Sequence, residues 1–97
     1  MKPVVMKKKS SQIATYLKSL AHPQRLHILC YLAEGERTVS EIQDETGISQ
    51  SQVSQFLSRM KVEGMLGSRR DGRSSLYKIT HNPLKKLLKF LTVSFAA

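Results

Sequence analysis

The predicted helix at residues 50–63 combines an apolar side with an opposite side of short polar residues. At about 100° per residue, its core-facing positions are Val53, Phe56, Leu57 and Met60. An ordinary solvent face is rich in Lys and Glu, whereas the exposed positions here are Ser51, Ser54, Gln55 and Ser58. Gln pairs with adenine N6 and N7, and Ser can donate to or accept from several bases. The pattern predicts base reading in double-stranded DNA by these four residues, together with Gln50 and Gln52 near the amino end.

Basic residues accompany this polar face, and the helix carries no acidic residue before Glu63. Lys and Arg position a protein on DNA through phosphates, and arginines can also grip a narrow minor groove. The residues expected to make such contacts are Arg59, Lys61, Arg69, Arg70 and Arg73.

The charge balance agrees with a polyanionic partner. The chain has 97 residues, with 16 Lys and Arg against 7 Asp and Glu, which gives a formal net charge of +9. Such a surplus favours nucleic acid or anionic membrane, although an inert basic surface is also compatible with it. The single cysteine, Cys30, cannot form an internal disulfide, and no export signal or membrane span is visible. These features predict a cytoplasmic protein.

Two short helices with clear start signals must position the polar face. Helices at about 38–46 and 50–63 are separated only by Gly47, Ile48 and Ser49. Each begins with the pattern of a capping box, the first from Thr38 to Glu41 and the second from Ser49 to Gln52. A three-residue turn containing Gly predicts a helix-turn-helix, although any compact helical hairpin can share the pattern.

A β-hairpin is expected after this motif, because Asp71-Gly72 separates strand-like segments at 65–70 and 73–80. A turn centred on this dipeptide opposes Leu66 to Tyr77, Ser68 to Ser75, and Arg70 to Arg73. Paired arginines at a projecting tip suit phosphate neutralisation, although both side chains could simply extend into water. With helices also predicted at 10–20 and from Pro23 to Gly35, the fold class is mostly α with a β-hairpin wing (α+β). The order is four helices, two strands and a last helix, a winged helix-turn-helix.

The last helix begins at Asn82-Pro83 and has more apolar surface than one small core should absorb. Its stripe, at i, i+3, i+4, i+7 and i+11, consists of Leu84, Leu87, Leu88, Leu91 and Phe95. We expect this stripe to form a homodimer interface. A helix lying on anionic membrane, or a cover over a monomeric core, remains an alternative. The expected organisation is a basic tail at 1–9 followed by one domain at 10–97.

Several segments resemble the ArsR/SmtB-type repressors, in matching order over about residues 12–95. They are Leu20-Ala21-His22-Pro23-Gln24-Arg25-Leu26-His27-Ile28-Leu29, Ser49 to Leu57, Glu63 to Leu66, and Arg69 to Arg73 with Leu76-Tyr77. The resemblance implies a dimeric winged helix-turn-helix that pairs through its first and last helices, including Ile13 and Leu17, and blocks or modulates transcription. Phe56 departs from the His found in many members, and its core-facing position predicts little effect on DNA binding.

The sensing function that is usual in this family has weak support in the chain. No cysteine pair occupies residues 39–46, and His22 and His27 lie five apart, which is poor ligand spacing on a helix. His81 alone precedes the last helix, whose lysines would repel a cation, so we expect no metal site and no cofactor. Cys30 resembles the first cysteine of sulfur- and redox-sensing members, but the partner in the last helix is absent. It is expected to be a small buried hydrophobe, with a thiol sensor as the alternative.

The resulting hypothesis is a regulator, expected to be a repressor, that binds an inverted-repeat operator as a homodimer. A protein-interaction or antirepressor module with the same fold is the alternative. An enzyme is not expected, because the sequence offers no nucleophile–base pair, no paired acids and no phosphate-binding Gly loop.

Overall fold

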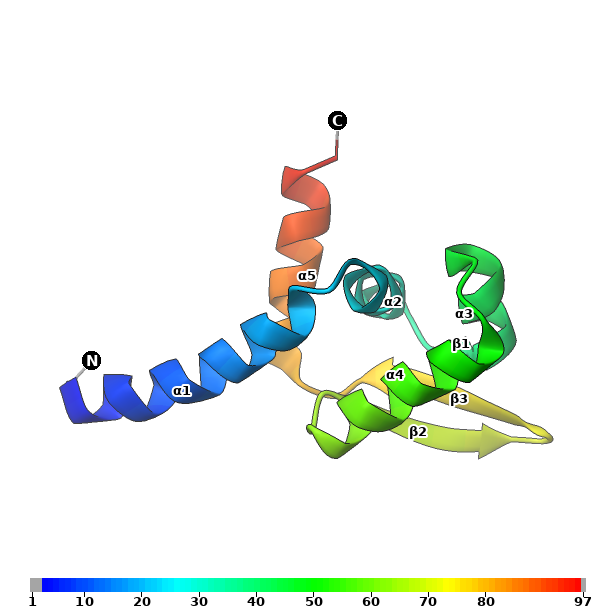
Figure 1. Cartoon of the computed structure of the whole chain (residues 1–97), viewed down its shortest axis with the longest axis horizontal. Helices are drawn as coiled ribbons and strands as arrows, with labels where there is room; N and C mark the ends of the chain where they lie inside the picture. The colour runs from blue at the N-terminus through cyan, green and yellow to red at the C-terminus, as the bar shows by residue number, and fades with distance from the viewer. Residues whose placement is uncertain (1–2, 97) are drawn as a thin grey trace.

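The computed structural model describes residues 3–96 and contains five helices and a three-stranded antiparallel sheet (Figure 1). The elements are α1 Pro3–Leu20, α2 Pro23–Ala33, β1 Arg37–Thr38, α3 Val39–Thr46, α4 Gln50–Val62, β2 Leu66–Asp71, β3 Ser74–Ile79 and α5 Asn82–Ser94. The predicted winged helix-turn-helix is confirmed. The two-residue strand β1 was not predicted, and it pairs with β3 to give the strand order β1-β3-β2.

Helix α1 begins at Pro3 rather than at residue 10, so the predicted start of the first helix is wrong. The division into a basic tail at 1–9 and a domain at 10–97 stays a prediction. Proline is tolerated in the first turn of a helix, and the lysines that follow it are good helix formers. Residues 1 and 2 of the predicted tail lie outside the described residues. The amino-terminal half of α1 projects away from the other elements (Figure 1).

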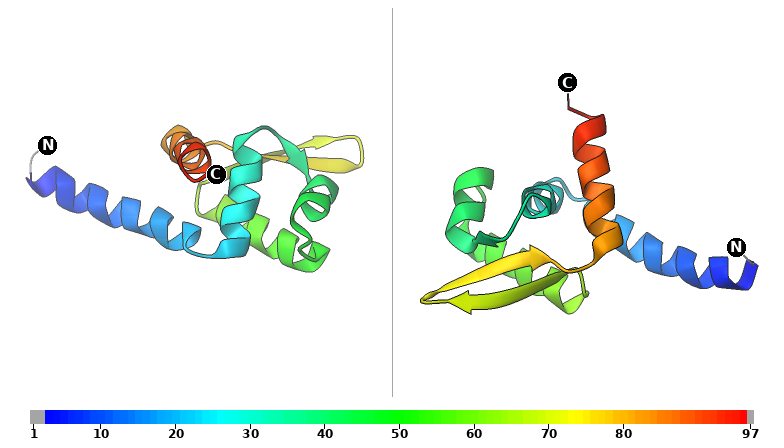
Figure 2. Two further views of the ribbon diagram at one scale, coloured as in Figure 1. Left: turned by 90° about the horizontal axis from the view of Figure 1, so that it is seen from above. Right: turned by 180° about the vertical axis from the view of Figure 1, so that it is seen from behind.

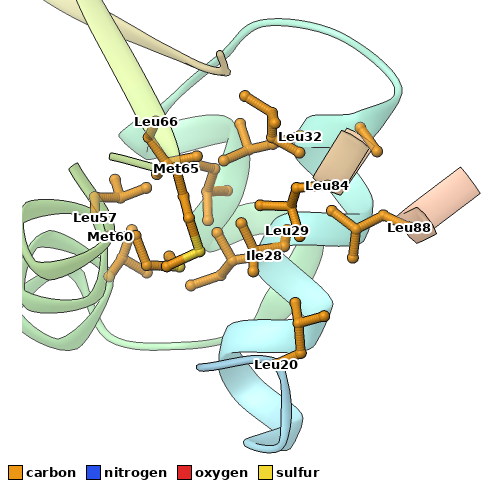
Figure 3. Close-up of a cluster of buried hydrophobic side chains, with 14 of the residues drawn as sticks. Leu20, Ile28, Leu29, Leu32, Leu57, Met60, Met65, Leu66, Leu84 and Leu88 are labelled. Carbon is orange, nitrogen blue, oxygen red and sulfur yellow. The ribbon is translucent and has the colours of Figure 1, made fainter. Parts of the chain in front are cut away.

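Helix α2 lies at the centre of the molecule, against α3, α5 and β3 (Figure 2). The residues that it buries are Ile28, Leu29, Leu32 and Ala33. Leu26 and Cys30 of the same helix are only partly buried, at the margin of the core. Around α2, the close-up in Figure 3 shows core side chains from α4, β2 and α5, including Leu57, Met60, Leu66, Leu84 and Leu88.

The capping signals predicted for the helix-turn-helix are largely present. At α3, Glu41 N–H donates to Thr38 Oγ1 over 3.1 Å, and Thr38 N–H donates to Glu41 Oε1 over 2.9 Å, which completes the box. At α4, Gln52 N–H donates to Ser49 Oγ over 3.3 Å. Between the helices, Gly47 adopts φ +72° and ends α3. These features fix where α4 starts and therefore which of its residues face outward.

The hairpin register differs from the prediction. The observed partners are Leu66–Ile79, Ser68–Tyr77, Arg70–Ser75 and Asp71–Ser74. The turn therefore consists of Gly72 and Arg73, and the predicted pairing of Arg70 with Arg73 is wrong. Gly72 has φ +63°, whereas no non-glycine residue within 3–96 has a positive φ. A turn with glycine first needs a positive φ at that residue alone, whereas the type I′ turn typical of Asp-Gly would also need one at Asp71.

Candidate nucleic-acid interface

The six residues predicted to read bases all lie on the solvent-exposed side of α4 or in its first turn. Val53, Leu57 and Met60 are fully buried, which turns the opposite side of the helix outward. The exposed residues are Gln50, Ser51, Gln52, Ser54, Gln55 and Ser58. Ser54, Gln55 and Ser58 also line an open hollow that continues to Arg59, Val62 and Glu63. The surface along the middle of the helix is therefore open and carries serine and glutamine side chains.

Phe56 occupies the boundary between the core and this surface. It is partly buried and packs against the core. Its ring lies 5.3 Å from the His22 ring in an edge-on arrangement, and the Arg25 guanidinium lies 5.4 Å from its centroid. An aromatic face attracts a guanidinium through its quadrupole. Phe56 thus connects α4 to the start of α2 and does not lie on the exposed polar side.

The carboxyl end of α4 is fastened to two other elements. Ser19 of α1 is buried, and its hydroxyl donates to the Glu63 carboxylate over 3.3 Å. Arg59 lies 4.0 Å from the same carboxylate. Lys61 Nζ donates to Ser68 Oγ on β2 over 2.6 Å. Arg59 and Lys61, two of the predicted phosphate contacts, are exposed and remain accessible from solvent.

The three wing arginines have different surroundings. Arg69 donates from Nε and Nη2 to the two carboxylate oxygens of Glu36, over 3.1 Å each. These hydrogen bonds lower the pKa of Glu36 below its usual value and raise that of Arg69. Arg70 and Arg73 are exposed, and neither forms an ion pair within residues 3–96. Arg70 and Arg73 therefore keep guanidinium groups that are open to a further partner, on either side of Asp71 and Gly72.

The acidic residues between 34 and 45 are largely engaged away from α4. Glu34 pairs with Arg37 at 3.7 Å, and Glu45 lies 3.9 Å from His27. Glu41 completes the α3 cap, and the backbone hydrogen bond from Thr38 lowers the pKa of Glu41. Four of the five acids between 34 and 45 are therefore engaged in ion pairs or a helix cap, and the nearest acid to the wing arginines is Asp71 at the tip itself.

The histidines and the cysteine have identifiable structural surroundings. His22 and His81 are the N-cap residues of α2 and α5, where Nδ1 accepts from Arg25 N–H and Leu84 N–H. Sequence reasoning missed this role, although the Pro that closely follows each His is a usual signal for a helix start. Cys30 is partly buried and lines an apolar groove with Leu26, Leu91 and Phe95. Within the described part of the chain, no three His, Cys, Asp or Glu residues gather as a metal site would require.

The residues predicted for a dimer interface separate into three groups by their burial in the single chain. Leu84 and Leu88 are only 3% and 0% exposed, so this part of the prediction is wrong: they belong to the core of the protomer. Leu87 and Leu91 are partly buried, while Ile13, Leu17 and Phe95 are exposed. Phe90 and Val93, which were not included, are 66% and 77% exposed on α5. Ile13, Leu17 and Leu87 also line a small apolar groove between α1 and α5.

Within residues 3–96, no helix has the length and apolar character needed to cross a membrane.

Comparison with known proteins places this fold and surface in a group of regulators. A "Biofilm growth-associated repressor" of Xylella fastidiosa is 35% identical over 92 residues, which cover 95% of this chain and 81% of that protein. A "Transcriptional activator HlyU" of Vibrio cholerae is 30% identical, over 89% of this chain and 80% of that protein.

One solved structure and one family model show further similarity to bacterial regulatory proteins. The homodimeric winged helix-turn-helix DNA-binding domain of a Mycobacterium bovis protein superposes with a TM-score of 0.77 at 32% identity. The match covers 92% of this chain and 82% of that one. The model of "Bacterial regulatory protein, arsR family" matches residues 22–68, which contain both helices of the helix-turn-helix. The chain is therefore a member of the arsR family of bacterial regulatory proteins.

Proposed function

We propose that this protein is a sequence-specific, double-stranded DNA-binding transcription regulator that acts as a homodimer on an inverted-repeat operator. The observation that carries the proposal is the exposed serine and glutamine face of α4, bounded by the arginines of the wing tip. Family membership supports the same function, because the relatives are named as regulators of transcription.

Helix α4 has the dimensions and chemistry of a recognition helix. Its 13 residues span about 20 Å, and a major groove about 12 Å wide admits an α-helix. Gln50, Gln52 and Gln55 would pair with adenine edges, while Ser51, Ser54 and Ser58 would adapt to several bases. No acidic side chain lies on this face before Glu63. Approach to the DNA therefore meets no local repulsion along α4.

The phosphate contacts are proposed to come from two places. Arg59 and Lys61 extend from the carboxyl-terminal half of α4, and Arg70 and Arg73 extend from the wing. Lys and Arg contacts to phosphates supply affinity without sequence preference and make binding depend on salt. Arg69 was predicted to be a further contact, but its guanidinium is already bound to Glu36.

A second copy of the chain is the proposed partner. Apolar surface on α1, on α5 and just beyond α5 is offered by Ile13, Leu17, Leu87, Leu91 and Phe95. The Mycobacterium bovis relative, whose title describes it as homodimeric, supports this arrangement. Two-fold symmetry would place two α4 helices about one DNA turn, roughly 34 Å, apart and would require an inverted repeat.

Repression is the proposed outcome, as the name of the Xylella relative suggests, although the Vibrio relative is named an activator. A bacterial regulator of transcription acts where DNA is transcribed, so the proposed location is the cytoplasm. Cys30 is the proposed position for any thiol-based response, because it is the one cysteine of the chain and lines a surface groove.

Selection of bound fragments from random duplexes, followed by footprinting, tests the proposal. We expect an enriched inverted repeat whose half-sites are protected one helical turn apart. Expression of a reporter gene placed downstream of the selected site should fall in the presence of the protein if it is a repressor. It should rise if the protein is an activator. Enrichment of no sequence at moderate salt would contradict DNA reading and favour the protein-interaction or antirepressor alternative.

A further inference from the structure

The wing strand β2 is bound from both of its faces by side chains of other elements. Ser68 accepts a hydrogen bond from Lys61 of α4 over 2.6 Å. The next residue, Arg69, donates two hydrogen bonds to Glu36, which precedes β1. Because successive strand residues point to opposite faces, these two contacts hold β2 from opposite sides.

The contact with Glu36 reaches across the whole sheet. Strand β1 pairs with β3, with Thr38 opposite Leu76, and β3 in turn pairs Leu76 with Arg69 on β2. Cross-strand partners share a face, so Glu36, two residues before Thr38, lies on the same face as Arg69. The Glu36–Arg69 pair therefore joins the two outer strands of the sheet over β3.

The geometry of this pair is suited to orienting a strand. Two parallel N–H···O bonds between a guanidinium and a carboxylate fix direction as well as distance. Both acceptor oxygens of Glu36 are occupied at 3.1 Å, and Glu36 is itself partly buried. Arg70 and Arg73, the free arginines of the wing tip, lie one and four residues after Arg69. A fixed Arg69 thus fixes the direction in which the tip projects.

We propose that Glu36 and Arg69 are positioning residues that hold the wing so that Arg70 and Arg73 meet the DNA, and that Arg69 is not a phosphate ligand. The proposal rests on the proposed function. The competing possibility is that Arg69 binds a phosphate and Glu36 merely shields its charge.

The two possibilities predict opposite changes in DNA affinity for the substitution Glu36→Gln. Glu36→Gln raises the net charge by one, so pure electrostatics strengthens binding to DNA. Loss of the positioning pair instead frees the wing and weakens binding. Since exposed ion pairs contribute little individually, we expect roughly two- to fivefold weaker binding to the selected duplex. Glu34→Gln, which makes the same charge change at an exposed residue outside the wing, should leave binding unchanged or slightly tighter.

Salt dependence and a charge exchange complete the experiment. Arg69→Gln should weaken binding to the selected duplex as Glu36→Gln does, with no change in the slope of log affinity against log salt concentration. Loss of one phosphate contact per protomer would instead reduce that slope by about 0.9 per site. Exchange of the pair, with Glu36→Arg and Arg69→Glu in one chain, should restore most of the wild-type affinity.

Amide hydrogen exchange of the free protein gives a readout without DNA. The amides of β2 and β3 should exchange faster in Glu36→Gln and at the wild-type rate in Glu34→Gln. Unchanged exchange, or Glu36→Gln binding as tightly as wild type or tighter, would overturn the positioning role. If the wild-type protein selects no duplex, the proposed function fails, and the exchange rates still test the contact itself.

Discussion

At the scale of single residues, Gly47 ends the first helix of the helix-turn-helix in a left-handed conformation. Its φ is +72°, and its N–H donates to Gln43 O over 2.8 Å. A Cβ placed at this position would meet no atom within 4 Å. A substitution here therefore tests backbone conformation alone, without steric overlap.

We predict that Gly47→Ala lowers the free energy of unfolding by about 1–2 kcal/mol, because a left-handed conformation is strained for an L side chain. Gly35→Ala is the matched control. Gly35 also has open space around it but no positive φ, so its replacement should be neutral or stabilising by up to about 1 kcal/mol. Urea denaturation measures both. Equal destabilisation by the two variants would show that the left-handed conformation at Gly47 does not require glycine.

The exposed residues of α4 could be predicted from the sequence because helical periodicity and the N-cap fix them locally. The pairing of Arg69 with Glu36 could not be predicted in this way. The two residues are 33 positions apart in the sequence, and only the folding of the sheet brings them together. The burial of Leu84 and Leu88 was missed for a related reason. The pattern of apolar residues on a helix does not distinguish the residues that pack in the core of the protomer from those that contact another molecule.

At the scale of elements, the capping box sets the start of α3 and depends on an ionised carboxylate. The backbone hydrogen bond from Thr38 lowers the pKa of Glu41 in the folded protein. A group whose folded pKa is lowered contributes stability that is complete above its unfolded pKa. That stability is lost as the pH falls through the folded pKa.

We predict that the stability advantage of wild type over Glu41→Gln is largest near neutral pH and disappears at acid pH below the usual carboxyl pKa. Melting temperatures measured from pH 7 to about pH 3 would show this convergence. Asp44→Asn removes an exposed carboxylate from the same helix and should keep the wild-type pH dependence. A constant difference between wild type and Glu41→Gln over the whole range would contradict the role of the charge.

Element positions were predicted where a cap or a breaker residue marks them, and less well elsewhere. Thr38, Gly47 and Asn82-Pro83 mark helix ends correctly. The start of α1 has no such marker beyond Pro3. The lysine-rich residues that follow are equally typical of a helix and of a basic tail. The hairpin was recognised but its register was wrong, because Asp71-Gly72 and Gly72-Arg73 both offer a two-residue turn and the choice depends on φ at Asp71.

At the scale of the whole molecule, most of the exposed large apolar side chains lie on α1, on α5 and just beyond α5. Ile13 and Leu17 of α1 are 48% and 50% exposed, and Phe95 beyond α5 is 83% exposed. Ile13 and Leu17 lie in the half of α1 that meets α5, where they line an apolar groove with Leu87. A second copy would bury this apolar surface and place two α4 helices on one duplex.

We predict that Leu17→Glu weakens dimerisation by at least about tenfold, because a carboxylate would have to be desolvated in an apolar interface. The protomer should stay folded, since Leu17 is not part of the core. Ser11→Glu adds the same charge to an exposed position of α1 on a different side of the helix and should leave the dimer intact. Sedimentation equilibrium compares the two variants, and equal dimerisation of both would exclude this face of α1 from the interface.

The most direct test of DNA reading compares wild type with the double substitution Ser54→Ala and Gln55→Ala on the α4 face. Affinity should be measured at one salt concentration for the selected duplex and for a scrambled duplex of the same composition. The ratio of the two affinities should fall by about tenfold or more, since each good base contact contributes about 1–3 kcal/mol of discrimination. Binding to the scrambled duplex and dimerisation should not change. An unchanged ratio in a folded, dimeric double variant would contradict base reading by this face.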